Sequence, residues 1–173
     1  MKHIRRWIVL GGLGAIVTMG ATAHAQASAT VFRFHFEEAV STPTSLPECL
    51  PADLVGTQSG VEVTDGQGVE APGGAFEVHG TTLFDYRVDF PDGRYVIGSA
   101  PGHFALHISP GGTVVTTSVV REPRTVYNAG GEPIGRGTIH ANSHTTFHDS
   151  NGNGLPDPGE ITSSVDRFSF TCS

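Results

Sequence analysis

The sequence predicts an all-β protein, an antiparallel meander of about eight strands that closes into a barrel. Apolar and polar residues alternate with period two along the chain, as at Phe32, Phe34 and Phe36. Clusters rich in proline and glycine, such as Pro91–Gly93 and Gly130–Pro133, separate the alternating segments. Beyond the N-terminal apolar run, no stretch has the period of an amphipathic helix.

The individual strands follow from this alternation. The first, near residues 30–37, is indicated by three phenylalanines that alternate with Arg33 and His35. The segment 75–90 has aromatic and β-branched residues at most even positions and polar residues such as Glu77 at odd ones. Turn residues divide the remainder, so further strands are expected near 58–64, 94–99, 103–109, 113–121, 124–127, 134–148 and 160–171.

The segment near 46–74 differs in composition from these strands. It carries Pro47, Pro51, Pro72 and several glycines among few large apolar residues. This composition predicts a long loop with at most one short strand. The loop would be either a lid over one mouth of the barrel or a surface loop tethered by a disulfide.

Closure of the sheet is inferred from its edges. About eight consecutive antiparallel strands leave two long unpaired edges unless the sheet closes, and a barrel removes both. A two-sheet β-sandwich is the alternative, because period-two alternation does not distinguish closure from stacking.

The N-terminus has the features of a secretory signal peptide. Three basic residues among the first six precede an apolar run over residues 7–19, and Ala23-His24-Ala25 provides a small-x-small cleavage signature. We therefore expect residues 1–25 to be removed and residues 26–173 to form one secreted β-barrel domain. The apolar run is too short for a membrane span, so no membrane insertion is expected.

The net charge of the mature chain limits the classes of molecule that it is expected to bind. Without its signal peptide the chain keeps seven arginines and no lysine against seventeen Asp and Glu, a formal net charge of about −10. Nucleic acids and anionic lipids need a basic surface, so neither is an expected partner. Cation binding is compatible with this charge.

The only two cysteines, Cys49 and Cys172, are expected to form one disulfide, because exported thiols usually oxidise. In a barrel the first and last strands are neighbours, which would let the two cysteines meet across that seam. The alternative, a metal-binding or catalytic cysteine, lacks a C-x-x-C spacing and a nearby histidine.

A calcium-binding pattern extends from Asp149 to Glu160, reading D-S-N-G-N-G-L-P-D-P-G-E. It has oxygen-bearing side chains at loop positions 1, 3, 5, 9 and 12 and glycine at position 6, as Ca²⁺ requires. Its three carboxylates repel one another unless a cation neutralises them. The expected ligands are the side chains of Asp149, Asn151, Asn153 and Asp157, the carbonyl of Leu155, and both carboxylate oxygens of Glu160.

This loop resembles the calcium loop of EF-hands, and more closely the D-x-N-x-N-G-x-x-D-x-x-E loops of β-rich extracellular proteins. Pro156 stands at loop position 8, where it cannot donate the backbone hydrogen bond that pairs two EF-hands. The flanking residues are typical of strands, so we expect a structural Ca²⁺ that stiffens a hairpin. A solvated hairpin loop without a metal is the alternative.

A broader resemblance is carried by the start A-T-V-F-R-F-H-F-E-E, the cysteine after it, the segment Y-N-A-G-G-E-P-I-G-R-G, the acidic loop and the terminal F-T-C. These features resemble a family of small secreted actinobacterial proteins of unknown function. The resemblance implies an allene-oxide-cyclase-like or lipocalin-like barrel and supports the Cys49–Cys172 pairing. It implies no catalytic residues.

Several histidines alternate along one expected strand, where His140, His144 and His148 share a face. Imidazoles could ligate Zn²⁺ or Cu²⁺, but strand residues four apart are separated by about 13 Å. A metal site would need help from another strand, and His103 and His107 would supply it if their strand lay alongside. Polar residues on a solvent or lumen face are the alternative.

Catalytic motifs such as G-x-S-x-G and H-E-x-x-H are missing from the sequence. Glu37 and Glu38 follow the first aromatic residues, and at most one of them faces the barrel interior. That carboxyl could act as a general acid or base. We expect a secreted, non-enzymatic calcium-binding barrel that binds a small hydrophobic ligand or a protein partner. The alternative is an isomerase or cyclase for a small hydrophobic substrate.

Overall fold

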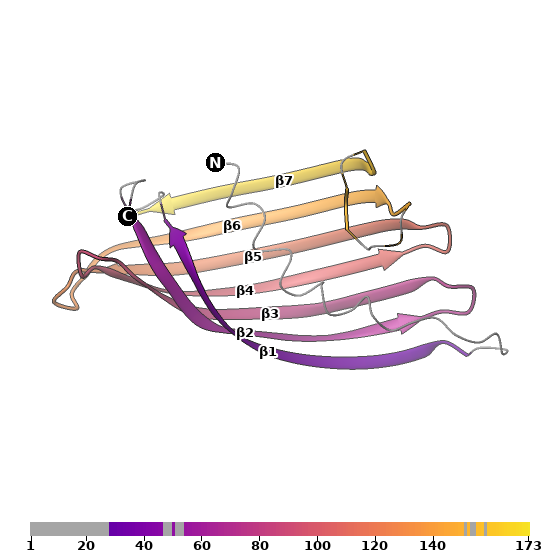
Figure 1. Ribbon diagram of the computed structural model, residues 1–173, viewed down its shortest axis with the longest axis horizontal. Helices are drawn as coiled ribbons and strands as arrows, with labels where there is room; N and C mark the ends of the chain where they lie inside the picture. The colour runs from indigo at the N-terminus through magenta and orange to yellow at the C-terminus, as the bar shows by residue number, and fades with distance from the viewer. Residues whose placement is uncertain (1–27, 47–49, 51–53, 151, 153–154, 158) are drawn as a thin grey trace.

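The computed structural model describes residues 28–46, 50, 54–150, 152, 155–157 and 159–173. Its strands form one antiparallel sheet (Figure 1) whose spatial order follows the sequence. They are β1 (Thr30–Ser45), β2 (Val55–Glu70), β3 (Phe76–Asp89), β4 (Tyr95–Ile108), β5 (Thr113–Tyr127), β6 (Pro133–His148) and β7 (Ile161–Cys172). The predicted all-β meander is confirmed, and within these ranges no helix is long and apolar enough to cross a membrane.

The hairpin turns contain the residues that the sequence indicated. Gly93, Gly112 and Gly131 have φ angles of 86°, 79° and 84°, which glycine adopts without steric cost. The turn between β3 and β4 is closed by hydrogen bonds from Phe90 N to Arg94 O and from Gly93 N to Phe90 O. Glycine therefore determines where these strands end.

Two expected turns do not end a strand. The strands expected near 94–99 and 103–109 both fall in the single strand β4, apart from Arg94 and Ser109, and those expected near 113–121 and 124–127 both fall in β5. Pro101 and Pro123 lie where the pairing between β4 and β5 is interrupted, after the pair Gly98–Arg124 and before Gly102–Val120. A proline cannot donate a ladder hydrogen bond, but here each strand remains paired with its other neighbour.

The segment near 46–74 was expected to be a long loop with at most one short strand near 58–64. That strand is confirmed, but it is longer than expected, because residues 55–70 form β2 and the loop expectation is wrong there. The glycines that suggested a loop lie opposite aromatic residues of β1: Gly68 pairs with Phe32 and Gly66 with Phe34. A Cβ at either glycine would overlap the phenylalanine ring opposite it. The small residues of β2 thus provide space for the large residues of β1.

One face of the sheet carries the buried side chains, and we call it the inner face. Its residues have even numbers in β1 to β5 and odd numbers in β6, as the registers require. The side chains of Val78, Val88, Val96, Val114 and Phe147 on this face are at most 2% exposed. The opposite, outer face is exposed along most of its length.

The first hairpin is strongly curled. The end of β1 and the start of β2 turn across the other strands on the inner side (Figure 1). Leu46, Leu50 and Leu54, between these strands, pack against a cluster that includes Tyr86 and Val126. The curl therefore covers one end of the inner face.

The expected closed barrel is not observed, because in the described residues β1 pairs only with β2 and β7 only with β6. The β-sandwich alternative is wrong, since all seven strands belong to one sheet. The number of strands explains part of the difference between the expected barrel and the open sheet. The sheet has fewer strands than expected because Pro101 and Pro123 do not divide β4 and β5. In a meander of seven strands, β1 and β7 run in the same direction, so closure would need a parallel pair.

Candidate functional site

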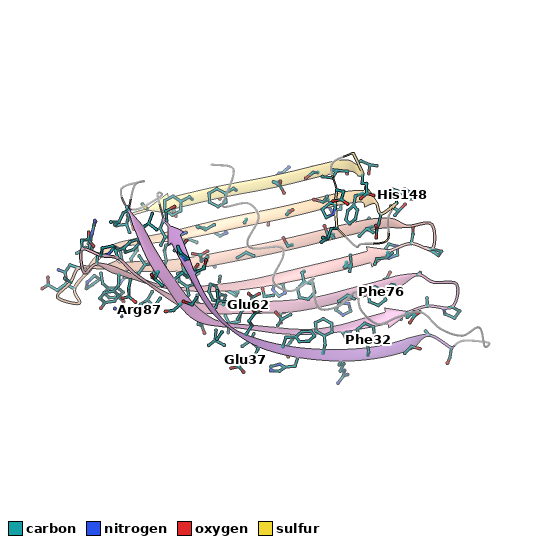
Figure 2. The ribbon with its side chains drawn as sticks, in the orientation of Figure 1. Phe32, Glu37, Glu62, Phe76, Arg87 and His148 are labelled. Carbon is teal, nitrogen blue, oxygen red and sulfur yellow. The ribbon has the colours of Figure 1, made fainter. Side chains whose placement is uncertain are left out.

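The uncovered part of the inner face is lined by phenylalanines from β1, β3 and β4. The ring of Phe32 stacks on Phe76 with centroids 5.7 Å apart (Figure 2), and Phe34 lies 6.5 Å from Phe104. Phe36 continues the row, 5.4 Å from Phe34, and is 42% exposed. Phe32, Phe34, Phe76 and Phe104 pack against a buried cluster of Val78, Leu106, Val114 and Phe147. These phenylalanines form an aromatic surface that packs against the buried cluster on one side and is accessible to solvent on the other.

Glycines position these rings. Gly80 lies opposite Phe104, in the same way as Gly66 and Gly68 lie opposite the phenylalanines of β1. A Cβ at Gly80 would come within 2.6 Å of the Phe104 ring. The rings of Phe32, Phe34 and Phe104 thus each occupy the space over a residue without a side chain. This arrangement also leaves room for the strong curl of β1 and β2.

Two carboxylates lie next to the aromatic surface. Glu38 and Glu62 are directly opposite each other in the β1–β2 pair, and both are on the inner face. Glu37 points to the other side of the ribbon, as Figure 2 shows for Glu37 and Glu62. Of the two candidates from the sequence, Glu38 is therefore the one on the inner face.

The environment of Glu62 favours its protonated form. Burial raises the pKa of Glu62 above its ordinary value, and the nearby negative charge of Glu38 raises it further. Its neighbour on β3 is Phe84, so one side of the carboxyl is apolar. No hydrogen bond or ion pair of either glutamate side chain is found within the described ranges. Such a carboxyl can donate a proton or a hydrogen bond to a ligand.

A buried polar network spans β3 to β5. Tyr86 Oη donates a hydrogen bond to Glu122 Oε1, and Arg124 Nη2 lies 3.3 Å from the same oxygen. The side chains of Arg124 and Glu122 are only 1% and 11% exposed, so each charge compensates the other away from water. The Arg124 guanidinium also lies 5.6 Å from the Phe170 ring centroid.

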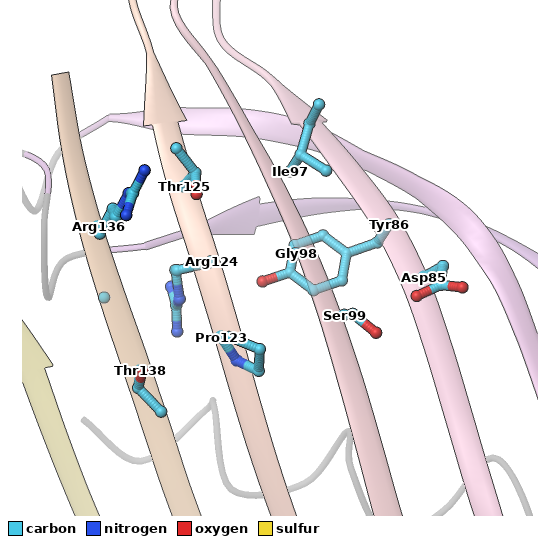
Figure 3. Close-up of a pocket in the computed structure, with 11 residues that line it drawn as sticks. Asp85, Tyr86, Ile97, Gly98, Ser99, Pro123, Arg124, Thr125, Arg136 and Thr138 are labelled. Carbon is cyan, nitrogen blue, oxygen red and sulfur yellow. The ribbon is translucent and has the colours of Figure 1, made fainter. Parts of the chain in front are cut away.

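Tyr86 reaches this network because residue 98 is a glycine. Gly98 stands between Tyr86 on β3 and Arg124 on β5 in the pairing register. Figure 3 shows the Tyr86 ring lying over Gly98 with its hydroxyl directed toward β5. A larger residue at position 98 would block that path.

Sequence reasoning missed Glu62, Glu122 and Arg124. Glu62 lies in the short strand that was expected near 58–64, within a segment otherwise expected to be a loop. Glu122 and Arg124 were missed because a break was expected between the strands near 113–121 and 124–127. The signal was nevertheless present: Val120, Glu122, Arg124 and Val126 are all even-numbered and share the buried face of β5.

The predicted calcium loop joins β6 and β7, so its expected hairpin setting is confirmed. Asp149 Oδ1 accepts a hydrogen bond of 2.8 Å from Gly152 N. Glu160 Oε1 accepts bonds from the Ser150 backbone N at 2.9 Å and the Ser150 hydroxyl at 2.5 Å. Glu160 Oε2 accepts from Asp157 N at 3.3 Å. The carboxylate at loop position 12 therefore turns back toward the loop start.

Opposing effects act on the Glu160 carboxylate in this loop. Hydrogen bonds from the Ser150 side chain and backbone lower the pKa of Glu160, whereas the charge of Asp149 acts in the opposite direction. Two acidic side chains of the predicted ligand set are thus close enough to repel. Asn151 and Asn153 lie outside the described residues, and Leu155 lies on the exposed part of the loop.

The histidines lie on the outer face. His140, His144 and His148 are all exposed on β6. His103 and His107 do not lie alongside these histidines, because β5 separates β4 from β6. No group of three or more His, Cys, Asp or Glu that could hold a metal is found in the described part of the chain.

The two cysteines cannot be compared directly, since Cys49 lies outside the described residues. Cys172 is the last residue of β7 and pairs with Gly137 of β6. It is therefore close in register to Arg124, which lies opposite Gly137 on the next strand. The signal peptide, residues 1–25, also lies outside the described residues.

Comparison with known proteins adds no assignment: no family model, no curated protein and no solved structure matches this chain.

Proposed function

We propose that this protein is a secreted, non-enzymatic carrier that binds a small, mostly apolar ligand on the aromatic inner face. The observation that carries the proposal is the accessible phenylalanine row, in which Phe36 is 42% exposed and its ring centroid lies 5.4 Å from that of Phe34. Soluble proteins rarely leave connected aromatic surface open without a use. The ligand would lie across Phe34 and Phe36 and direct a polar end toward Glu62.

The polar end of the ligand is expected to be uncharged or basic. Glu38 and Glu62 make that end of the inner face acidic, so a ligand carboxylate would be repelled. A ligand hydroxyl can instead form a hydrogen bond with the Glu62 carboxyl in either of its protonation states, because a hydroxyl both donates and accepts. Retinol and retinoic acid differ only in this end group and make a suitable pair of probes.

The test is a fluorescence titration with both probes. Saturable binding of retinol, with retinoic acid at least about tenfold weaker, is the expected result. Phe36→Ala should weaken retinol binding. Phe168→Ala is the matched control, because Phe168 is also about half exposed, at 52%, but lies on β7. Retinol binding that does not saturate, or that is equally weak in both variants, would exclude this carrier function.

The barrel and the calcium ion belong to the same proposal. Closure would bring β1 and β7 together, and a Cys49–Cys172 disulfide would tie the curled first hairpin to the end of β7. A structural Ca²⁺ would hold the β6–β7 hairpin loop through the six predicted ligands. These two links would stabilise opposite ends of the last strand.

An isomerase or cyclase is the second candidate, and the raised pKa of Glu62 favours it. In its protonated form, which the raised pKa favours, Glu62 beside the aromatic surface could act as a general acid on an unsaturated substrate. Chromatography of retinol after incubation would detect new double-bond isomers. Isomers formed by the wild type but not by Glu62→Gln, with retinol binding retained, would establish catalysis.

A further inference from the structure

The outer face contains a shallow depression of about 540 Å³ above β3 to β6 (Figure 3). It lies where the β4–β5 pairing is interrupted between Gly98 and Gly102. This depression is separated from the aromatic inner face by the sheet itself. It therefore forms a second candidate site, independent of the proposed carrier function.

The register places its outer-face residues in two adjacent rows. One row contains Asp85 opposite Ser99, and Pro123 opposite Thr138. The other contains Ile97 opposite Thr125, and Thr125 opposite Arg136. Neighbouring strands are about 4.8 Å apart and alternate residues of a strand about 6.8 Å apart, so the two rows match a mono- or disaccharide in size.

The side chains alternate in their hydrogen-bonding chemistry. Ser99, Thr125 and Thr138 offer hydroxyls that both donate and accept, Asp85 only accepts, and Arg136 only donates. No hydrogen bond or ion pair occupies these five side chains among the described residues. They are held on paired strands, and the backbone of Arg136 is fixed by two 2.9 Å hydrogen bonds with Ser173. The donors and acceptors are thus preorganised rather than carried on a loop.

Apolar surface borders the hydroxyls. Ile97 is 46% exposed within the depression. Tyr95 and Tyr127 follow on the same face, stacked with ring centroids 4.8 Å apart, and the Arg87 guanidinium lies 3.8 Å from the Tyr95 ring. A sugar ring presents hydroxyls at its edge and C–H groups on its face, which match this combination of polar row and aromatic border.

We propose that this outer-face depression binds a neutral saccharide through Asp85, Arg136 and the three hydroxyls. Asp85 on β3 and Arg136 on β6 lie at opposite ends of the site, and the third charged lining residue, Arg124, is compensated by Glu122, so the site has little net charge to select an ion. Its open shape permits binding to the end of a longer glycan as well as to a free sugar. Binding is expected to be weak, because the site stays wet.

The test is an NMR titration of the ¹⁵N-labelled protein with maltose, cellobiose and trehalose at millimolar concentrations. Saturable shifts confined to amides around Ser99, Thr125 and Arg136 are the expected result for at least one sugar. Asp85→Asn should weaken that binding about tenfold or more, because a charge-assisted hydrogen bond is lost.

A matched pair of variants separates a site from a general surface effect. Thr125→Val should weaken sugar binding about fivefold. Thr117→Val changes the same residue type on the same strand and face, outside the depression, and should leave binding unchanged. Shifts that grow linearly for all three sugars, equal binding by both variants, or saturation by the zwitterion glycylglycine alone would each overturn the proposal. None of these outcomes affects the retinol test on the inner face.

Discussion

The ring of Tyr86 occupies the space that a side chain at Gly98 would fill. The two residues are direct partners in the β3–β4 register, and a Cβ at Gly98 would overlap the ring and its hydroxyl. This relationship lets a tyrosine of β3 reach across β4 to the buried Glu122 of β5. The stability of the network therefore depends on a residue that has no side chain.

Gly98→Ala should destabilise the fold by about 1–3 kcal/mol, the usual cost of inserting a methyl group into a filled space. Gly135→Ala is the control, because a Cβ there meets its nearest atom only at 3.8 Å. Urea unfolding followed by far-UV circular dichroism measures both. A Gly98→Ala protein as stable as the Gly135→Ala protein would show that the ring can move aside.

Tyr86→Phe should cost about 1–3 kcal/mol of folding stability, since Glu122 loses a buried hydrogen-bond donor. Tyr127→Phe removes a hydroxyl for which no hydrogen bond is found among the described residues, so it should change stability little. Chemical denaturation of the two variants under the same conditions gives the comparison. Equal losses would mean that the network does not stabilise the fold through this bond.

Stability should respond to pH through Glu62. Its pKa is raised from 4.5 in the folded protein, so the folded state favours the protonated carboxyl. This contribution is fully present below the unfolded pKa and is lost as pH rises through the folded pKa. Glu62→Gln should therefore be more stable than the wild type at neutral pH, and the difference should shrink toward pH about 4.

The control for Glu62 is Glu37→Gln, which removes a charge from the other side of the same ribbon. The free energy of unfolding is measured by urea titration from acidic to neutral pH. The difference between Glu37→Gln and the wild type should not change with pH in the way expected for Glu62→Gln. A Glu62→Gln difference that stays constant with pH would be inconsistent with a raised pKa.

The β6–β7 loop should make thermal stability depend on calcium. If Ca²⁺ binds the folded state alone, an ion concentration ten times the dissociation constant stabilises it by about 1.4 kcal/mol. Calorimetry with calcium and with chelator should show a higher midpoint with the ion. Glu160→Gln should abolish that shift, whereas Glu132→Gln, in the β5–β6 turn, should retain it. Absence of any shift in the wild type at millimolar calcium would refute the metal site.

The two cysteines should be found in one disulfide. Non-reducing peptide mapping by mass spectrometry should recover a linked Cys49–Cys172 peptide, and alkylation of the native protein should label neither residue. On the chain-entropy model, reduction should cost about 4–5 kcal/mol, since the bond closes a long loop. Quantitative alkylation of both thiols would disprove the link.

The sequence by itself determined the antiparallel meander and most of its turns. Period-two alternation in β1 and β3 decided which side chains face the core, and glycines such as Gly93 and Gly131 decided where hairpins turn. These properties are local, because alternation and positive φ depend on neighbouring residues only. The hairpin setting of the Asp149–Glu160 loop was predictable for the same reason.

Only the tertiary structure decided which glycines and prolines interrupt a strand. Gly66 and Gly68 belong to β2 because phenylalanine rings from β1 lie over them, and Pro123 stays within β5 because β6 still pairs with that strand. Both outcomes depend on residues far away in the sequence. The same holds for the opposition of Glu38 and Glu62, for the path of Tyr86 over Gly98, and for the open edges of β1 and β7. These features are determined by the residues that the strand register places opposite one another. The local preference of each residue for strand or turn does not determine them.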